Sequence, residues 1–242
     1  MIRQLVRGLT RRAGLELSRY PQSDPLWRVA RLLGAHGVDR LLDVGANNGG
    51  YAAAVRGFGY SGQISSFEPV QEPFQKLAFV SAADPAWRVH KCAIGATKGD
   101  IIINVAGNAA ASSSVLPMLD RHLREAPSSA YVGQEQVPQQ RLDDVLAQGD
   151  GNRLFLKIDV QGYERFVLDG AQQLLASGRI VGLQMELSFV PLYDGGMSWR
   201  EGFDRAEALG MILMSLDQGF TADSGQMLQA DGVFFIPHAT ES

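Results

Sequence analysis

Short apolar runs alternate along most of the chain with segments whose apolar residues recur at helical spacing. The strand-like runs occupy residues 40–44, 63–67, 87–95, 101–105, 153–160, 180–187, 211–216 and 232–236. The helical segments occupy residues 25–34, 51–56, 72–80, 142–146, 161–178 and 199–209. This alternation predicts one doubly wound α/β domain with a mostly parallel sheet. No long crossover separates the last two strands, which predicts an antiparallel edge.

Residues 107–136 interrupt the pattern. Serines and prolines break any long period there, and short connections between strands and helices do not need a segment of this length. We therefore expect a functional loop or lid over the substrate site. His122 lies inside it and is a candidate general base.

The first 24 residues differ in charge from the rest of the chain. Residues 1–20 hold five arginines against one glutamate, a net charge of +4, and Ile2, Leu5, Val6 and Leu9 form a helical stripe. The segment is too short and too charged to span a bilayer, and it lacks the apolar core of a secretory signal. One hypothesis is that the segment touches an anionic membrane or a partner. The hypothesis that we favour is a helix that packs on the domain or caps the substrate site. The predicted division is a basic segment 1–24 and a domain 25–242.

Composition narrows the function classes. The chain has 242 residues and a net charge of −4, which gives no support to nucleic-acid binding. Its single cysteine, Cys92, excludes an internal disulfide and fits a reducing compartment. We expect a cytoplasmic protein, with peripheral membrane contact through residues 1–20 as the alternative.

The turn after the first predicted strand carries the clearest chemistry. Residues 41–44 run into Gly45-Ala46-Asn47-Asn48-Gly49, and a helix follows, as in nucleotide-binding α/β units. A dinucleotide site would read G-x-G-x-x-G, but Asn47 stands where the middle glycine should be. Asp43 would repel a diphosphate and suits a cationic ligand. S-adenosylmethionine carries an ammonium and a sulfonium and no phosphate, so it fits better than NAD(P).

The second predicted strand ends at Glu68-Pro69. An acidic residue at this place in a βαβ cofactor fold bonds the ribose hydroxyls. We therefore predict that Glu68 holds the ribose of the cofactor.

Four segments together point to one family. They are residues 43–49 (DVGANNG), 67–69 (FEP), 93–95 (AIG) and 156–164 (LKIDVQGYE). In this order and spacing they resemble the FkbM family of S-adenosylmethionine-dependent methyltransferases. Asn47 agrees with the family's pattern, whereas Gln161 replaces its common glutamate. The resemblance implies a Rossmann-like class I methyltransferase fold with a seven-stranded sheet, and O-methylation of a hydroxyl on a sugar, glycolipid or polyketide-like small molecule.

The resemblance also implies a set of cofactor residues. The turn would line the methionine end, Glu68 and Pro69 the ribose, and residues 91–93 the adenine. The full predicted set is Asp43, Gly45, Asn47, Asn48, Gly49, Glu68, Pro69, Lys91, Cys92, Ala93 and Asp159.

Asp159 is the first candidate for the base that receives the acceptor's proton, because it ends a core strand on the cofactor side. Lys157 lies two residues earlier and faces the same way. The pair either orients and deprotonates a hydroxyl or is a structural ion pair, and His122 is a third candidate base. A non-catalytic binding module for S-adenosylmethionine or a nucleotide, or less favourably an NAD(P) oxidoreductase, is the alternative function.

Other strand-end residues are assigned to the acceptor. We predict that Glu186, Gly162 and Glu164 contact the substrate. Asp159 and Glu186, together with Asp217, are candidate ligands for Mg²⁺, which needs only one or two carboxylates plus water.

Overall fold

The computed structural model describes residues 21–146 and 152–237. The sequence-based predictions for residues 1–20 fall outside these ranges. Among the described helices, none is long and apolar enough to cross a bilayer.

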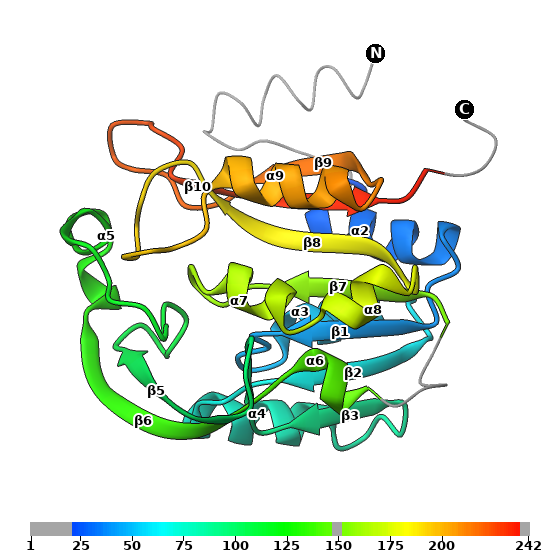
Figure 1. Cartoon of the computed structure of the whole chain (residues 1–242), viewed down its shortest axis with the longest axis horizontal. Coiled ribbons are helices and arrows are strands. Elements are labelled where there is room, and N and C mark those ends of the chain that lie inside the picture. The colour runs from blue at the N-terminus through cyan, green and yellow to red at the C-terminus, as the bar shows by residue number, and fades with distance from the viewer. Residues whose placement is uncertain (1–20, 147–151, 238–242) are drawn as a thin grey trace, which may run out of the picture.

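A seven-stranded sheet forms the centre of the molecule (Figure 1). Its strands are β1 (Arg40–Val44), β2 (Gln63–Phe67), β3 (Trp87–His90), β7 (Leu154–Ile158), β8 (Ile180–Ser188), β9 (Ile212–Gln218) and β10 (Gln229–Phe235). Their order is β3-β2-β1-β7-β8-β10-β9. The first five in this order are parallel, and β10 runs antiparallel to both β8 and β9. This confirms the predicted mostly parallel sheet with an antiparallel edge.

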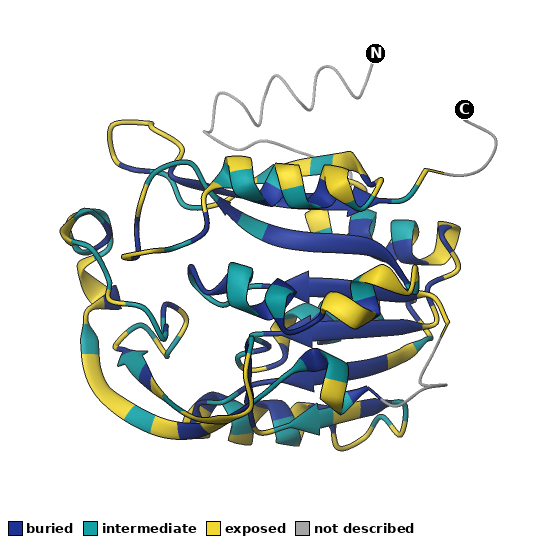
Figure 2. Ribbon diagram, viewed as in Figure 1, coloured by how far each residue is buried: buried dark blue, intermediate teal, exposed yellow. Residues whose placement is uncertain are grey.

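Helices cover both faces of the sheet, which makes three layers. One face packs against α2 (Pro25–Ala35), α3 (Gly50–Gly57) and α4 (Gln71–Ser81) through one buried apolar cluster. The other packs against α6 (Leu142–Val145), α7 (Glu164–Asp169), α8 (Gln172–Ala176) and α9 (Trp199–Ala208) through a second. The inner strands β1 and β7 are buried along their whole length, as Figure 2 shows in dark blue. Burial on both faces explains why these strands read as nearly continuous apolar runs.

A second, smaller sheet departs from the prediction. Residues 87–95 do not form one strand, because β3 ends at His90 and Ala93–Ile94 (β4) joins another sheet. There β4 pairs with β6 (Tyr131–Gln140), and β6 pairs antiparallel with β5 (Gly99–Ala106). Residues 131–136 are thus strand rather than loop. The outer half of β6 is largely exposed, so its polar sequence carries no apolar alternation that would reveal a strand.

The rest of the predicted lid, residues 107–130, connects β5 to β6 and contains α5 (Asp120–Glu125) and the short 3-10 helix Pro127–Ser129. The predicted helix 161–178 also divides, into α7 and α8. The break lies at Gly170, where the backbone passes against the carbonyl of Gly95. A β-carbon at Gly170 would lie 2.0 Å from that oxygen.

This contact makes Gly170→Ala a sharp test of the packing between the α7–α8 junction and the residue that follows β4. Because backbone must move to admit the methyl group, we expect a loss of about 1–3 kcal/mol of unfolding free energy. Gly34→Ala is the matched control, because an added β-carbon there meets nothing within 4 Å and lies in α2. It should be neutral or stabilise by up to about 1 kcal/mol. Urea titrations measure both, and equal effects would contradict the proposed steric origin.

Candidate functional site

The turn after β1 is held between the ends of β2 and β7. The backbone N–H groups of Gly45 and Ala46 both donate to the carbonyl of Phe67, and that of Asp159 donates to the carbonyl of Val44. Gly45 has a φ of +76°, and a β-carbon there would lie 1.8 Å from the carbonyl oxygen of Asp159. Only glycine fits this position. Asn47 adopts a φ of +46°, which asparagine tolerates better than most residues.

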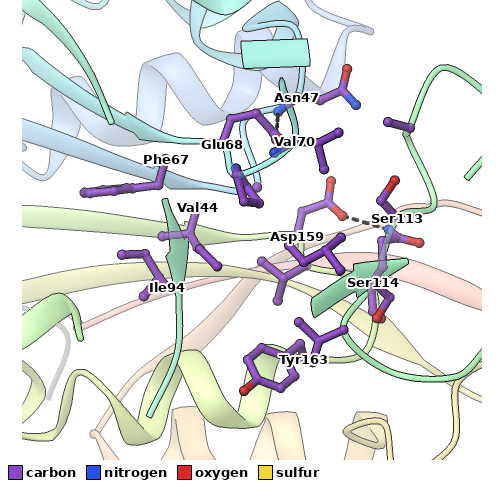
Figure 3. A pocket seen from close by; sticks show the side chains of 18 of the residues that line it. Val44, Asn47, Phe67, Glu68, Val70, Ile94, Ser113, Ser114, Asp159 and Tyr163 are labelled. Carbon is purple, nitrogen blue, oxygen red and sulfur yellow. Dashed lines mark hydrogen bonds between the residues drawn. The ribbon is translucent and has the colours of Figure 1, made fainter. Parts of the chain in front are cut away.

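A cavity opens beside this turn, at the carboxyl ends of β1, β2 and β7 (Figure 3). Its wall includes seven of the predicted cofactor residues, namely Gly45, Asn47, Glu68, Pro69, Cys92, Ala93 and Asp159. Val70, Ile94 and Ile103 add an apolar surface, while Asn47 and Asp159 supply polar groups. The cavity therefore has an apolar part that suits a flat base and a polar part that suits a charged ligand.

Glu68 links the turn to the tip of β2. Its carboxylate accepts hydrogen bonds from the backbone N–H groups of Asn47, at 2.8 Å, and Val70, at 2.9 Å. Burial raises the pKa of Glu68 to about 7, although these two bonds and the charge of Lys157 oppose the rise. Each carboxylate oxygen has two lone pairs, so Glu68 keeps acceptor capacity for a ligand hydroxyl.

Four other predicted cofactor residues do not line this cavity. Asp43 is fully buried below the turn. Gly49 packs against Leu77 and Trp87, and with Asn48 it borders a separate groove between α3 and α4. Lys91 is exposed, and its ammonium donates to the side chain of Gln71. The pattern placed these residues near the site but could not give the direction of their side chains.

Lys157 ties β7 to β1. Its ammonium lies 3.1 Å from Asp43 Oδ1 and 3.6 Å from Asp159 Oδ2, and it donates to the carbonyl of Gly45 at 2.9 Å. Burial alone would lower the pKa of Lys157, but the charges of Asp43 and Asp159 outweigh it and raise the pKa. Lys157 is absent from the cavity wall and remains protonated at neutral pH. The geometry favours the structural ion pair over a base.

His122 and Glu164 also lie away from the cavity. His122 is buried, with its ring 5.2 Å from that of Tyr193 and 5.5 Å from that of Phe220, and burial lowers its pKa. Glu164 is buried too, and its carboxylate accepts from the backbone N–H groups of Val160 and Gly162. Burial raises the pKa of Glu164 to about 7. In the described structure, His122 therefore packs and Glu164 shapes the turn after β7; neither reaches the cavity.

Gln161 and Tyr193 form a network that the sequence did not indicate. Gln161 Nε2 donates to Asp159 Oδ1 at 2.8 Å and to Glu186 Oε2 at 3.1 Å, and the Tyr193 hydroxyl donates to Gln161 Oε1 at 2.8 Å. Gln161 has a φ of +55° and precedes Gly162, whose φ is +93° and which packs against Tyr193. The only sequence signal was the departure from the family's glutamate. Gln161 thus joins the predicted base to the predicted substrate carboxylate.

The carboxylates do not fit a metal site. Among residues 21–146 and 152–237, no three histidine, cysteine or acidic side chains converge as metal ligands do. The Gln161 amide lies between Asp159 and Glu186, and Asp217 is paired with Arg28 at 2.7 Å. The predicted Mg²⁺ ligands are thus engaged with other partners, and no step below uses a metal.

Part of the predicted lid does cover the cavity. Ala110, Ala111 and residues 113–115 contribute to its wall. Ser114 Oγ donates to the carbonyl of Gln161 at 2.7 Å, and Asn47 Nδ2 donates to that of Ala109 at 3.4 Å. These bonds attach the segment after β5 to both turns that frame the cavity.

The strand order, the reversed β10 and the cavity beside the β1 turn define a Rossmann-like class I methyltransferase fold. The sequence signature of the methyltransferase FkbM domain matches residues 43–221. The chain therefore belongs to the FkbM methyltransferase family. No curated protein matches it.

Solved structures resemble the chain only distantly. An rRNA methylase from Streptococcus thermophilus is 9% identical, with a TM-score of 0.47 over 92% of this chain and 99% of its own. A 1,6-didemethyltoxoflavin-N1-methyltransferase from Burkholderia thailandensis, solved with bound 1,6-didemethyltoxoflavin and S-adenosylhomocysteine, is 9% identical, with a TM-score of 0.45 over 90% of this chain and 80% of its own. An uncharacterised protein from Listeria monocytogenes serotype 4b is 14% identical, with a TM-score of 0.47 over 89% and 68%.

Replacing Lys157 by methionine tests its structural role. The change would leave Asp43 buried without a counter-charge, so we expect a loss of about 3–5 kcal/mol of unfolding free energy. Asp43→Asn in the same chain should restore much of it, which a double-mutant cycle measures. Lys91→Met, at an exposed lysine, is the control. A Lys157→Met protein with wild-type stability would show that the pair does not hold the turn.

Proposed function

We propose that this protein is an S-adenosylmethionine-dependent methyltransferase that methylates a hydroxyl oxygen of a sugar, glycolipid or polyketide-like small molecule, with Asp159 as the base. The observation that supports it most is the single cavity that joins the Gly45 turn, Glu68 and Asp159. Family membership supports the methyl transfer. The small-molecule acceptor and the cytoplasmic location are carried over from the sequence-based expectations as part of this proposal. The net charge of −4 gives no reason to propose a nucleic-acid partner.

The residues present fit the cofactor. Val70 and Ile94 would flank the adenine, Glu68 would accept from the ribose hydroxyls, and the Gly45–Asn47 turn would face the methionine end. When bound, S-adenosylmethionine supplies a methyl group activated by its positive sulfur. The chain then has to position the acceptor and take its proton, and positioning alone can account for much of such a rate.

Asp159 is placed for the proton. Its side chain is 41% exposed and lines the cavity, whereas that of Lys157 is 6% exposed. The Gln161 amide holds Oδ1, which leaves Oδ2 to accept a proton from an acceptor hydroxyl. Because Lys157 faces Oδ2 from 3.6 Å, it also fixes the direction of the carboxylate.

Cofactor binding should depend on pH through Glu68. Its pKa of about 7 belongs to the free protein, and ribose hydroxyls donate to the ionised carboxylate. Binding therefore favours the deprotonated form: affinity is full above pH 7 and falls as pH drops through it, by up to about tenfold per unit. Calorimetric titration with S-adenosylhomocysteine between pH 5.5 and 8.5 measures this.

Glu68→Gln is the matched variant, because it keeps the shape and cannot ionise. It should bind more weakly at pH 8 and lose most of the pH dependence. A pH profile identical to that of the wild type would show that Glu68 does not hold the ribose.

Asp159→Asn should separate binding from catalysis. Loss of the base is expected to slow methyl transfer about 10²–10⁴-fold, while S-adenosylhomocysteine binds within about threefold of wild type. The assay follows transfer of a labelled methyl group to a panel of sugars, glycolipids and polyketides. Asp100→Asn, at an exposed carboxylate on β5, is the control.

Transfer by Asp159→Asn at the wild-type rate would remove Asp159 from the proposed role. Cofactor binding without transfer to any acceptor would favour a non-catalytic binding module, and NADH binding would favour an oxidoreductase.

A further inference from the structure

Residues 105–113 form a short loop that closes on itself beside the cavity. Its two ends are joined, because Asn104 and Ser114 exchange backbone hydrogen bonds of 2.9 and 3.1 Å. Compact loops whose ends lie close together in this way often have a function. Residues 110–111 belong to the cavity wall, and Figure 3 shows Ser114 across the cavity from Val44. The loop therefore forms the side of the cavity that faces the end of β1.

The tip of this loop, residues 108–112, contains strained backbone. Ala109 and Ala110 have φ angles of +56° and +61°, in the left-handed region where the β-carbon of an L-residue crowds its own backbone. Within the part of the chain that the structure describes, the other non-glycine residues with positive φ are Asn47 and Gln161, and both line the same cavity. Strained backbone that gathers around one site points to a part in the function of that site.

Hydrogen bonds hold the tip in this conformation. The side chain of Asn108 bonds Ser112 twice, because its Nδ2 donates to Ser112 Oγ at 2.9 Å and its Oδ1 accepts from the Ser112 N–H at 3.2 Å. A longer bond, of 3.4 Å, runs from Asn47 Nδ2 to the carbonyl of Ala109 and links the tip to the β1 turn. The strain in the tip thus acts against the bonds that close it.

The base of the loop is fixed more firmly than the tip. Ser114 Oγ donates to the carbonyl of Gln161 at 2.7 Å, and the backbone of Ser114 pairs with that of Asn104 in β5. The N–H of Ala106 donates to Ser113 Oγ at 3.0 Å. The cavity can therefore open on this side when the tip leaves its turn and the base stays in place.

We propose that residues 108–112 are a gate to the cavity, a strained turn that opens when Ala109 and Ala110 leave the left-handed region. The inference rests on the proposed function, in which this cavity holds S-adenosylmethionine. A ligand in such a pocket buries most of its surface, so part of the wall has to move aside for entry and again for release. Strain in the closed turn makes that opening easier.

Ala109→Gly tests the gate, because glycine adopts a positive φ without strain and Ala109 is absent from the cavity wall. The substitution stabilises the closed turn relative to the open one. Association and dissociation of S-adenosylhomocysteine should therefore both slow by about three- to tenfold, while the dissociation constant stays within about twofold. Surface plasmon resonance on the full-length protein measures the rates. Ala130→Gly, at an exposed alanine with a φ of −50° in the same connection, is the matched control and should leave both rates unchanged.

Asn108→Ala removes the two bonds to Ser112 and should have the opposite effect. Both rates should rise by about fivefold, and combination with Ala109→Gly should bring them back toward the wild-type values. Hydrogen exchange reports the opening without any ligand. The amides to follow are those of residues 110, 111 and 113, which donate to backbone carbonyls within the loop. Their exchange should slow in Ala109→Gly and become faster in Asn108→Ala.

Unchanged rates and unchanged amide exchange in Ala109→Gly would overturn the gate, and so would an equal effect of Ala130→Gly. Faster dissociation in Ala109→Gly with an unchanged association rate would also overturn it, because the tip would then be a rigid part of the wall. The two proposals fail in different ways. A wild-type protein that binds no S-adenosylhomocysteine would overturn the proposed function, and the gate with it, whereas unchanged exchange overturns the gate alone.

Discussion

The buried charge of Asp43 is the constraint on which the site depends. A fully buried, ionised carboxylate needs a counter-charge, because the protein interior solvates a charge poorly. Lys157 provides that charge from the adjacent position of the neighbouring strand, since Asp43 and Lys157 are partners in the β1–β7 register. The same ammonium bonds the carbonyl of Gly45. One ion pair thus joins two strands and fixes the turn that begins the cavity.

Two buried glutamates fix the backbone of the turns on either side of the cavity. Glu68 accepts from the N–H groups of Asn47 and Val70, and Glu164 accepts from those of Val160 and Gly162. Each carboxylate accepts hydrogen bonds from backbone N–H groups that would otherwise lack partners. Burial raises the pKa of both glutamates to about 7. The turns on both sides of the cavity are therefore held by the same interaction, a buried carboxylate that accepts from two backbone N–H groups. Of the two, only Glu68 lines the cavity, so only Glu68 is placed to contact a ligand there.

Local sequence patterns were enough to predict those parts of the fold and of the site that depend on residues close together in the chain. The strand, turn and helix around Gly45 and the place of Glu68 followed from sequence, because parallel strands end at the same edge of the sheet. The pairing of Lys157 with Asp43 did not, since spacing gives a residue's face but not the strand beside it. The inward position of His122 depends on packing against Tyr193 and Phe220. The strand β6 was missed because its exposed half has no apolar period.

Burial then distinguishes carboxylates that look alike in the sequence. A group that exchanges a proton with a ligand must reach the cavity, and Asp159 does so with a side chain that is 41% exposed. Asp43 is buried in an ion pair with Lys157, and Asp217 forms an ion pair with Arg28. A glutamate at position 161 would set a third carboxylate beside Asp159 and Glu186, where like charges repel. The amide of Gln161 instead donates to both. Gln161 therefore bridges the two acids through one amide group, while Lys157 faces the other oxygen of Asp159 from 3.6 Å.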